Sequence, residues 1–130
     1  MLRYAFLFFL LSGAIRGYGQ EVVSMGKLEK ILDPGAGDTA SWYINDHCFI
    51  QGPDGKWHMF GITGMNAPKK WDESHFAHAV ADSFTGVWTK LPFALTARPD
   101  LNETVLWAPY VIRQGDTYYM YYCGGHPDHG

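Results

Sequence analysis

The sequence predicts an all-β fold built from short antiparallel strands. Brief apolar runs alternate with turn clusters rich in Gly, Pro and Asp along most of the 130 residues. Aromatic side chains make up 16% of the chain, and they pack well on the pleated surface of a sheet. After residue 20 the apolar residues show no helical period. The second half of the chain also repeats the pattern of the first, which is typical of a propeller.

The first predicted element after the N-terminus is a lead-in, residues 20–41, whose turn cluster spans Asp33 to Asp38. Two strands follow, Trp42 to Gln51 and Trp57 to Thr63. Between them lies Pro53-Asp54-Gly55-Lys56, a turn in which Pro presets φ and Gly accepts a positive φ. The two strands therefore form a predicted hairpin.

Two shorter strands, His75 to Ala81 and Val87 to Leu91, complete a predicted group of four after a loop. The pattern then restarts with strands at Leu106 to Arg113 and Thr117 to Cys123, joined by the turn Gln114-Gly115-Asp116. No helix longer than two turns is expected after residue 20.

The two hairpins resemble each other. Trp57-His58-Met59-Phe60 matches Tyr118-Tyr119-Met120-Tyr121 at an offset of about 61 residues, and Phe49-Ile50 matches Val111-Ile112 at about 62. Four strands that repeat are the signature of a propeller blade; two unrelated hairpins of a β-sandwich are the alternative. Because a blade needs a neighbour on each side, residues 42–130 are expected to be the truncated N-terminal part of a propeller domain, about one and a half blades.

Composition and charge argue against two classes of binding partner, nucleic acids and membrane surfaces. The chain is 47% hydrophobic and 18% charged, which is ordinary for one globular domain and argues against disorder. The formal net charge is −3 without a basic patch, so a nucleic-acid partner is not expected. No polybasic segment suggests binding to a membrane surface.

Residues 1–19 have the layout of a secretory signal peptide. Arg3 supplies a positive start, residues 4–15 are almost wholly apolar, and small residues, Gly17 and Gly19, precede Gln20. The apolar run is too short to span a bilayer comfortably. We expect a mature chain that starts near Gln20 and is secreted or periplasmic, without membrane attachment; a buried N-terminal strand or helix is the alternative.

Asp46 is the candidate catalytic residue. The innermost strand of each blade lines the central funnel of a propeller, and an Asp flanked there by apolar residues would place a carboxylate in a partly desolvated cavity. Asp is otherwise unfavourable inside a strand. The alternative is that Asp46 caps a turn or accepts hydrogen bonds from nearby backbone N–H groups.

Aromatic and imidazole side chains supply candidate sugar contacts. Trp71 and Trp107, and also Trp42, offer flat faces on which sugar rings stack, although buried packing is the commoner use of Trp. His78 and His75 can hydrogen-bond sugar hydroxyls, although packed or surface His is common. Asn45, beside Asp46, is a further candidate for substrate binding.

The remaining motifs are weaker. Cys48 and Cys123 permit a disulfide in an exported chain, but both lie in apolar runs where a buried free thiol is normal. No cofactor is expected, and the spacing of His47, His58 and His126 does not support a metal site. Asn102-Glu103-Thr104 fits an N-glycosylation sequon, a triplet that is common by chance.

Six segments of the chain carry a resemblance to known families: Tyr43–Asp46, Gly55–Phe60, Trp71–Val80, Thr85–Leu95, Leu106–Ile112 and Tyr118–Tyr122. The first four resemble the opening blade of glycoside hydrolase family 32, which carries Trp-Met-Asn-Asp-Pro-Asn-Gly and then Gly-Lys-Tyr-His-Leu-Phe. The last two resemble family 43, with its Trp-Ala-Pro-Asp-Val and Tyr-Tyr-Leu-Tyr-Tyr signatures. Both families belong to one superfamily of five-bladed β-propellers, so the resemblance implies this fold over about residues 42–125.

The resemblance implies a glycoside hydrolase that acts on O-glycosidic bonds in oligo- or polysaccharides. Asp46 matches the nucleophile of family 32 and the general base of family 43, while a second Asp and an acid Glu come from later blades; the chain alone is thus expected to be inactive. His47 replaces the Pro of family 32, and Tyr110 replaces the usual Asp of family 43. A non-catalytic carbohydrate-binding propeller and a purely structural exported β-domain are therefore the rival hypotheses.

Overall fold

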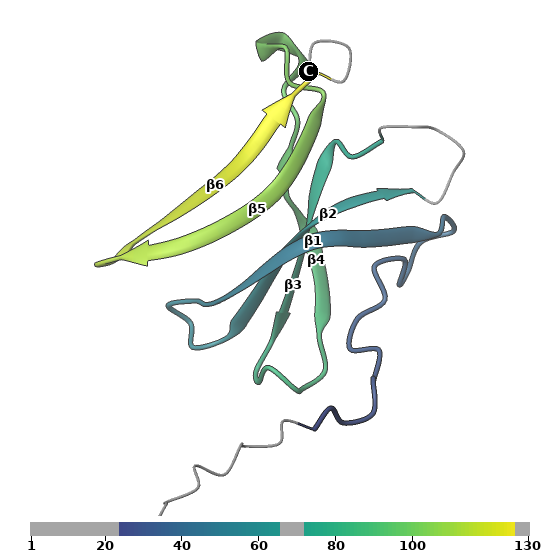
Figure 1. The fold of residues 1–130 in the computed structure, drawn as a ribbon, viewed down its shortest axis with the longest axis vertical. Coiled ribbons are helices and arrows are strands. Elements are labelled where there is room, and N and C mark those ends of the chain that lie inside the picture. The colour runs from purple at the N-terminus through teal and green to yellow at the C-terminus, as the bar shows by residue number, and fades with distance from the viewer. Residues whose placement is uncertain (1–23, 66–71, 127–130) are drawn as a thin grey trace, which may run out of the picture.

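The fold was taken from a computed structural model that describes residues 24–65 and 72–126 (Figure 1). These residues form six strands and one short 3-10 turn, η1 (Pro99–Leu101), and no α-helix occurs within them. The all-β prediction is confirmed. The strands are β1 (Trp42–Gln51), β2 (Trp57–Met65), β3 (His75–Ala81), β4 (Thr89–Thr96), β5 (Val105–Gln114) and β6 (Thr117–Gly125).

The strands form two antiparallel sheets. β1 to β4 make one four-stranded sheet in which each strand pairs with the next along the chain, and β5 pairs with β6 as a separate hairpin. Figure 1 shows the β5–β6 hairpin as a curved ribbon beside the larger sheet. A four-stranded antiparallel meander followed by a new hairpin is compatible with a propeller blade and the beginning of the next.

Local chemistry closes both hairpins. In the first, Gly55 adopts a φ of 78°, and the Asp54 carboxylate accepts a hydrogen bond from the Lys56 backbone N–H at 3.0 Å. In the second, Gly115 adopts a φ of 61°. Residues with a side chain rarely take these φ values, so the glycines determine where each strand reverses.

Two clusters of buried side chains form the core. Met59, Ala79, Ala81 and Trp88 form the first, within the four-stranded sheet and the turn that precedes β4. Ile62, Phe76, Ala97 and Leu106 form the second. Since Leu106 belongs to β5, the second cluster joins the two sheets, and a backbone hydrogen bond from Leu106 N–H to Glu73 C=O at 2.8 Å supports the same junction.

A β-bulge interrupts the first strand of each hairpin. Two residues of β1, Asn45 and Asp46, lie opposite one residue of β2, because the pairing steps from Ile44 with Thr63 to His47 with Gly61. In β5 the residues Ala108 and Pro109 take the same place, between the pairs of Trp107 with Cys123 and Tyr110 with Tyr121. Pro109 lacks an N–H and Ala108 has a φ of 50°, and both features suit a bulge.

The pairing also corrects the offset between the two hairpins. β1 and β5 are both 10 residues long and correspond at an offset of 63 positions (Trp42 to Val105). β2 and β6 are both nine residues long and correspond at 60 (Trp57 to Thr117). The sequence alignment was therefore out by one residue on each strand, because aromatic similarity between neighbouring positions outweighed the true register.

The fourth strand differs from its prediction. It was expected at Val87 to Leu91, but β4 begins at Thr89 and continues to Thr96, and Val87 is exposed before it. The observed strand includes Pro92. The structure accommodates it where the pairing is irregular: the register passes from Phe76 with Leu95 to His78 with Leu91, so that Pro92 to Ala94 face a single residue of β3. β4 is the outer edge of the sheet, where a missing N–H is tolerated.

The lead-in before β1 contains no strand between residues 24 and 41, and its turn falls at residues 34–37, within the predicted cluster. Among the described residues, no helix is long and apolar enough to cross a membrane. The predicted signal peptide, residues 1–19, lies outside the described ranges.

Phe76 is 0% exposed in the cluster that joins the sheets, so Phe76→Ala is expected to lower the free energy of unfolding by about 3–5 kcal/mol. Phe93→Ala is the matched control, because Phe93 is 38% exposed and mainly stacks on neighbouring rings; it should cost about 1 kcal/mol. Urea denaturation of the two variants measures the difference. Equal losses would show that the second cluster is not the structural junction.

Candidate functional site

The β1 bulge presents Asn45 and Asp46 at the surface. Both side chains are exposed, whereas Cys48 further along the strand is buried. The hollow beside the bulge has a volume of about 420 Å³ and is lined by Ile44, Asn45, Asp46 and His47. Asp46 is the one acidic residue in that lining, and its carboxylate is available to a ligand.

The apolar neighbours of Asp46 predicted a partly desolvated carboxylate. In the structure Ile44 and Phe49 pack against the cluster of Met59 and Trp88. Asp46 itself lies among the exposed residues of β1. Any desolvation of this carboxylate would therefore have to come from a partner surface or a ligand, not from the described residues of its own sheet.

Gly61 makes room for the bulge. A Cβ atom at this position would lie 2.8 Å from Ile44 Cγ2 and 3.1 Å from His47 Cβ, which is closer than side chains tolerate. Ile44 and His47, which flank the Asn45–Asp46 pair, thus lie close to the backbone of β2 at Gly61, where no side chain is present. The sequence analysis did not single out Gly61; its signal was a glycine inside an apolar strand, which often marks a bulge or a close backbone approach.

Trp107 lies in a hydrogen-bonded bridge that sequence analysis missed. Its indole Nε1–H donates to Glu73 Oε2 at 2.5 Å, and the Tyr43 hydroxyl donates to Glu73 Oε1 at 2.9 Å. Burial, followed by the hydrogen bond to the Glu73 carboxylate and its negative charge, raises the pKa of Tyr43 to about 12. Glu73 lies at the end of the loop expected before the third strand, and sequence analysis did not single it out.

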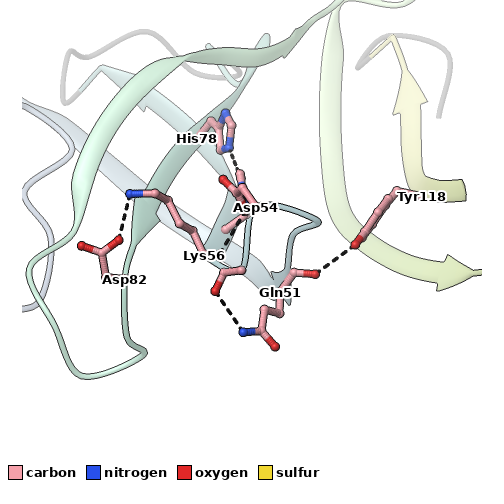
Figure 2. A network of polar contacts seen from close by, with 8 residues as sticks. Gln51, Asp54, Lys56, His78, Asp82 and Tyr118 are labelled. Carbon is pink, nitrogen blue, oxygen red and sulfur yellow. Dashed lines mark hydrogen bonds and ion pairs between the residues drawn. The ribbon is translucent and has the colours of Figure 1, made fainter. Parts of the chain in front are cut away.

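His78 lies in another cluster. Its Nε2 is 2.9 Å from His58 Nδ1, and His58 Nε2 is 3.2 Å from Asp54 Oδ1, so the three side chains form a chain of polar contacts near the β1–β2 turn. Figure 2 shows Asp54 and His78 in this network, with the ion pair of Lys56 and Asp82 nearby. His78 also stacks on Phe60. Its hydrogen bonding to sugar hydroxyls stays a prediction.

The remaining candidates are scattered. His75 stacks on Phe93 with ring centroids 4.3 Å apart, and Trp42 packs at a tilt against the same ring. Burial lowers the pKa of His75, although the charge of Asp72 opposes the shift. Trp71 lies outside the described residues. Of the predicted residues, the structure thus brings Asn45 and Asp46 together, and it links Trp107 to the same strand through Glu73 and Tyr43.

Neither cysteine forms a disulfide. Cys48 is buried and Cys123 is exposed, and both thiols are free. Burial raises the pKa of the Cys48 thiol, which disfavours the reactive thiolate. Within the described ranges, no group of three or more His, Cys, Asp and Glu side chains could hold a metal ion.

The chain matches no family model, no curated protein and no solved structure.

Replacing Gly61 with Ala should displace the bulge. The new methyl group would collide with Ile44 and His47, so Gly61→Ala is expected to cost about 1–3 kcal/mol of stability and to shift the backbone amide resonances of Asn45 and Asp46. Gly125→Ala is the control, because a Cβ there meets nothing within 4 Å. Denaturant unfolding and NMR spectra measure both effects. Unchanged resonances in Gly61→Ala would contradict the proposed role of this glycine.

The lowered pKa values of His75 and His78 predict that the protein loses stability in acid. Burial, and secondarily the charge of His58, lowers the pKa of His78 below its usual 6.5. At a pH between the folded and unfolded pKa values of His78, the unfolded chain binds more protons than the folded chain. The stability that comes from a neutral, buried His78 is therefore complete above about pH 6.5, and it is lost as the pH falls from 6.5 through the folded pKa. His78→Gln should flatten the fall in unfolding free energy between pH 7 and 5, leaving the part due to His75. His75→Gln should flatten the slope independently, because burial also lowers the pKa of His75. An unchanged slope in both variants would contradict the prediction.

Proposed function

We propose that the chain is the N-terminal part of a secreted β-propeller glycoside hydrolase. In this proposal Asp46 acts as general base or nucleophile on O-glycosidic bonds of oligo- or polysaccharides. The observation that carries it is the bulge in β1, which presents the Asp46 carboxylate from the first strand of a four-stranded meander. Asp is unfavourable inside a strand, and bulges often re-aim a side chain next to an active site.

Hydrolysis of a glycosidic bond requires two carboxyl groups, about 5–5.5 Å apart in retaining enzymes and about 6.5–9.5 Å apart in inverting ones. Asp46 is the sole acid in the lining of its hollow. The proposal therefore places the second acid on further blades that face the bulge. The described part of the chain alone is not expected to turn over substrate.

The surface of the β5–β6 hairpin supports the proposal of further blades. Four of its large side chains are exposed: Tyr110, Ile112, Tyr119 and Tyr121. Exposed apolar surface of this kind on a two-stranded sheet is costly, and an isolated hairpin is at best marginally stable. The remaining strands of a second blade, packed on a third, would cover it.

One residue favours a second candidate, a carbohydrate-binding propeller without catalysis. Tyr110 follows the β5 bulge, and the residue is 62% exposed. The resemblance to family 43 would place an Asp there. An exposed tyrosine provides a flat face for a sugar ring and no acid–base group.

Asp46→Asn in the full-length gene product tests the proposal. Asn keeps the size and the hydrogen-bonding capacity of Asp but removes the charge that a base or nucleophile needs. Glycosidase turnover should fall by at least about 10²-fold, while unfolding free energy stays nearly unchanged because the side chain is exposed. Asp116→Asn is the control, since Asp116 is exposed in the β5–β6 turn.

Near-normal turnover in Asp46→Asn would show that the catalytic assignment is wrong. A parent protein that binds oligosaccharides without cleaving them would instead favour the binding propeller. Loss of folding in Asp46→Asn alone would make Asp46 a structural residue.

A further inference from the structure

Glu73 joins the first strands of the two hairpins. Its carboxylate accepts hydrogen bonds from Tyr43 on β1 and from Trp107 on β5, one at each oxygen. Its backbone carbonyl accepts a third, from Leu106 N–H at 2.8 Å. Tyr43 and Trp107 come from separate sheets, so one side chain fixes their relative position.

The bridge acts at the residues that precede the two bulges. Trp107 is the last paired residue before the bulge of β5, as Ile44 is before the bulge of β1, and Tyr43 is the neighbour of Ile44. A change in the Glu73 side chain would therefore alter how the β5 bulge lies relative to Asp46.

The Glu73 side chain matches the hydrogen-bonding groups of both partners. The indole N–H is only a donor, so it needs an acceptor. Tyr43 also donates to Glu73, and its phenol stays protonated over the working range of pH. The two Glu73 oxygens accept hydrogen bonds from the Trp107 indole and the Tyr43 hydroxyl, so each donor has an acceptor. The Trp107 ring packs on the cluster of Ile62 and Phe76 and remains partly exposed, so it is held yet accessible.

We infer that Glu73 is a positioning residue that holds the indole of Trp107 as a sugar-stacking surface for the site of Asp46. The inference rests on the proposed function. Glu73 does not touch the sugar in this scheme; it acts through Trp107. Its loss should therefore weaken binding of the saccharide more than it slows the chemical step.

Four variants of the full-length gene product test this role. Glu73→Ala removes both acceptors. Glu73→Gln keeps one oxygen for the indole, and its amide can donate to the Tyr43 hydroxyl, so it should rescue the geometry. Trp107→Phe keeps an aromatic face but removes the N–H that Glu73 holds. Glu103→Gln is the matched control, because Glu103 is a buried carboxylate that, like Glu73, accepts a hydrogen bond from a tyrosine hydroxyl, here from Tyr122 at 3.2 Å.

The probes are xylotriose, arabinotriose and kestose, one from each of three sugar classes, with Kd from calorimetry and KM and kcat where turnover occurs. Glu73→Ala and Trp107→Phe should raise Kd and KM by up to about tenfold, the range expected for a lost aromatic contact, while kcat changes less than about threefold. Glu73→Gln should restore most of the affinity. Glu103→Gln should lower the melting temperature without changing Kd.

The outcomes separate the two proposals. If the parent binds a probe and the Glu73 and Trp107 variants bind it equally well, Glu73 is only structural and this inference is overturned. If Glu103→Gln weakens binding as much as Glu73→Ala does, the effect reflects general destabilisation, which also overturns it. If the parent binds none of the three probes, the proposed function fails and the saccharide role of Glu73 fails with it. If Glu73→Ala does not fold, the Kd values of the other two variants test the inference. Weaker binding by Trp107→Phe, with most of the affinity kept in Glu73→Gln, would support it, and parent-like binding by Trp107→Phe would overturn it.

Discussion

The arrangement of the first strand depends on one extra residue. Ile44 and Phe49 are five positions apart, and in a regular strand an odd spacing places two side chains on opposite faces. Both pack against the same core cluster, because the bulge at Asn45 and Asp46 restores a common face. Without the bulge, either Ile44 or Phe49 would leave the core. The exposure of Asp46 is thus coupled to the packing of the sheet.

The same constraint operates in the second hairpin. Leu106 and Val111 are also five positions apart and both are buried, with a bulge at Ala108 and Pro109 between them. The two hairpins share strand lengths, the place of the bulge and its effect on the core, while few residues are identical. The shared property is therefore geometric, which explains why an alignment by residue type missed the register by one position.

Much of the fold follows from local sequence. Short apolar runs and turn residues predicted six strands, and β1 and β3 have the predicted bounds. The bridge through Glu73 was not predictable in this way, because Tyr43, Glu73 and Trp107 are distant in sequence and meet only after two sheets pack. The contact of His58 with His78 likewise depends on the pairing of β2 with β3. The odd spacing of Ile44 and Phe49 was a signal of the bulge that sequence analysis did not use.

The position of Pro92 has a consequence for behaviour at high concentration. β4 is the outer strand of its sheet, and an open strand edge is a template on which other chains can add by backbone pairing. Pro92 has no N–H to donate to an incoming strand. The irregular stretch from Pro92 to Ala94 also interrupts the regular series of backbone donors and acceptors with which a new strand would pair. Pro92 would therefore protect this edge of the sheet against edge-to-edge aggregation in crowded surroundings.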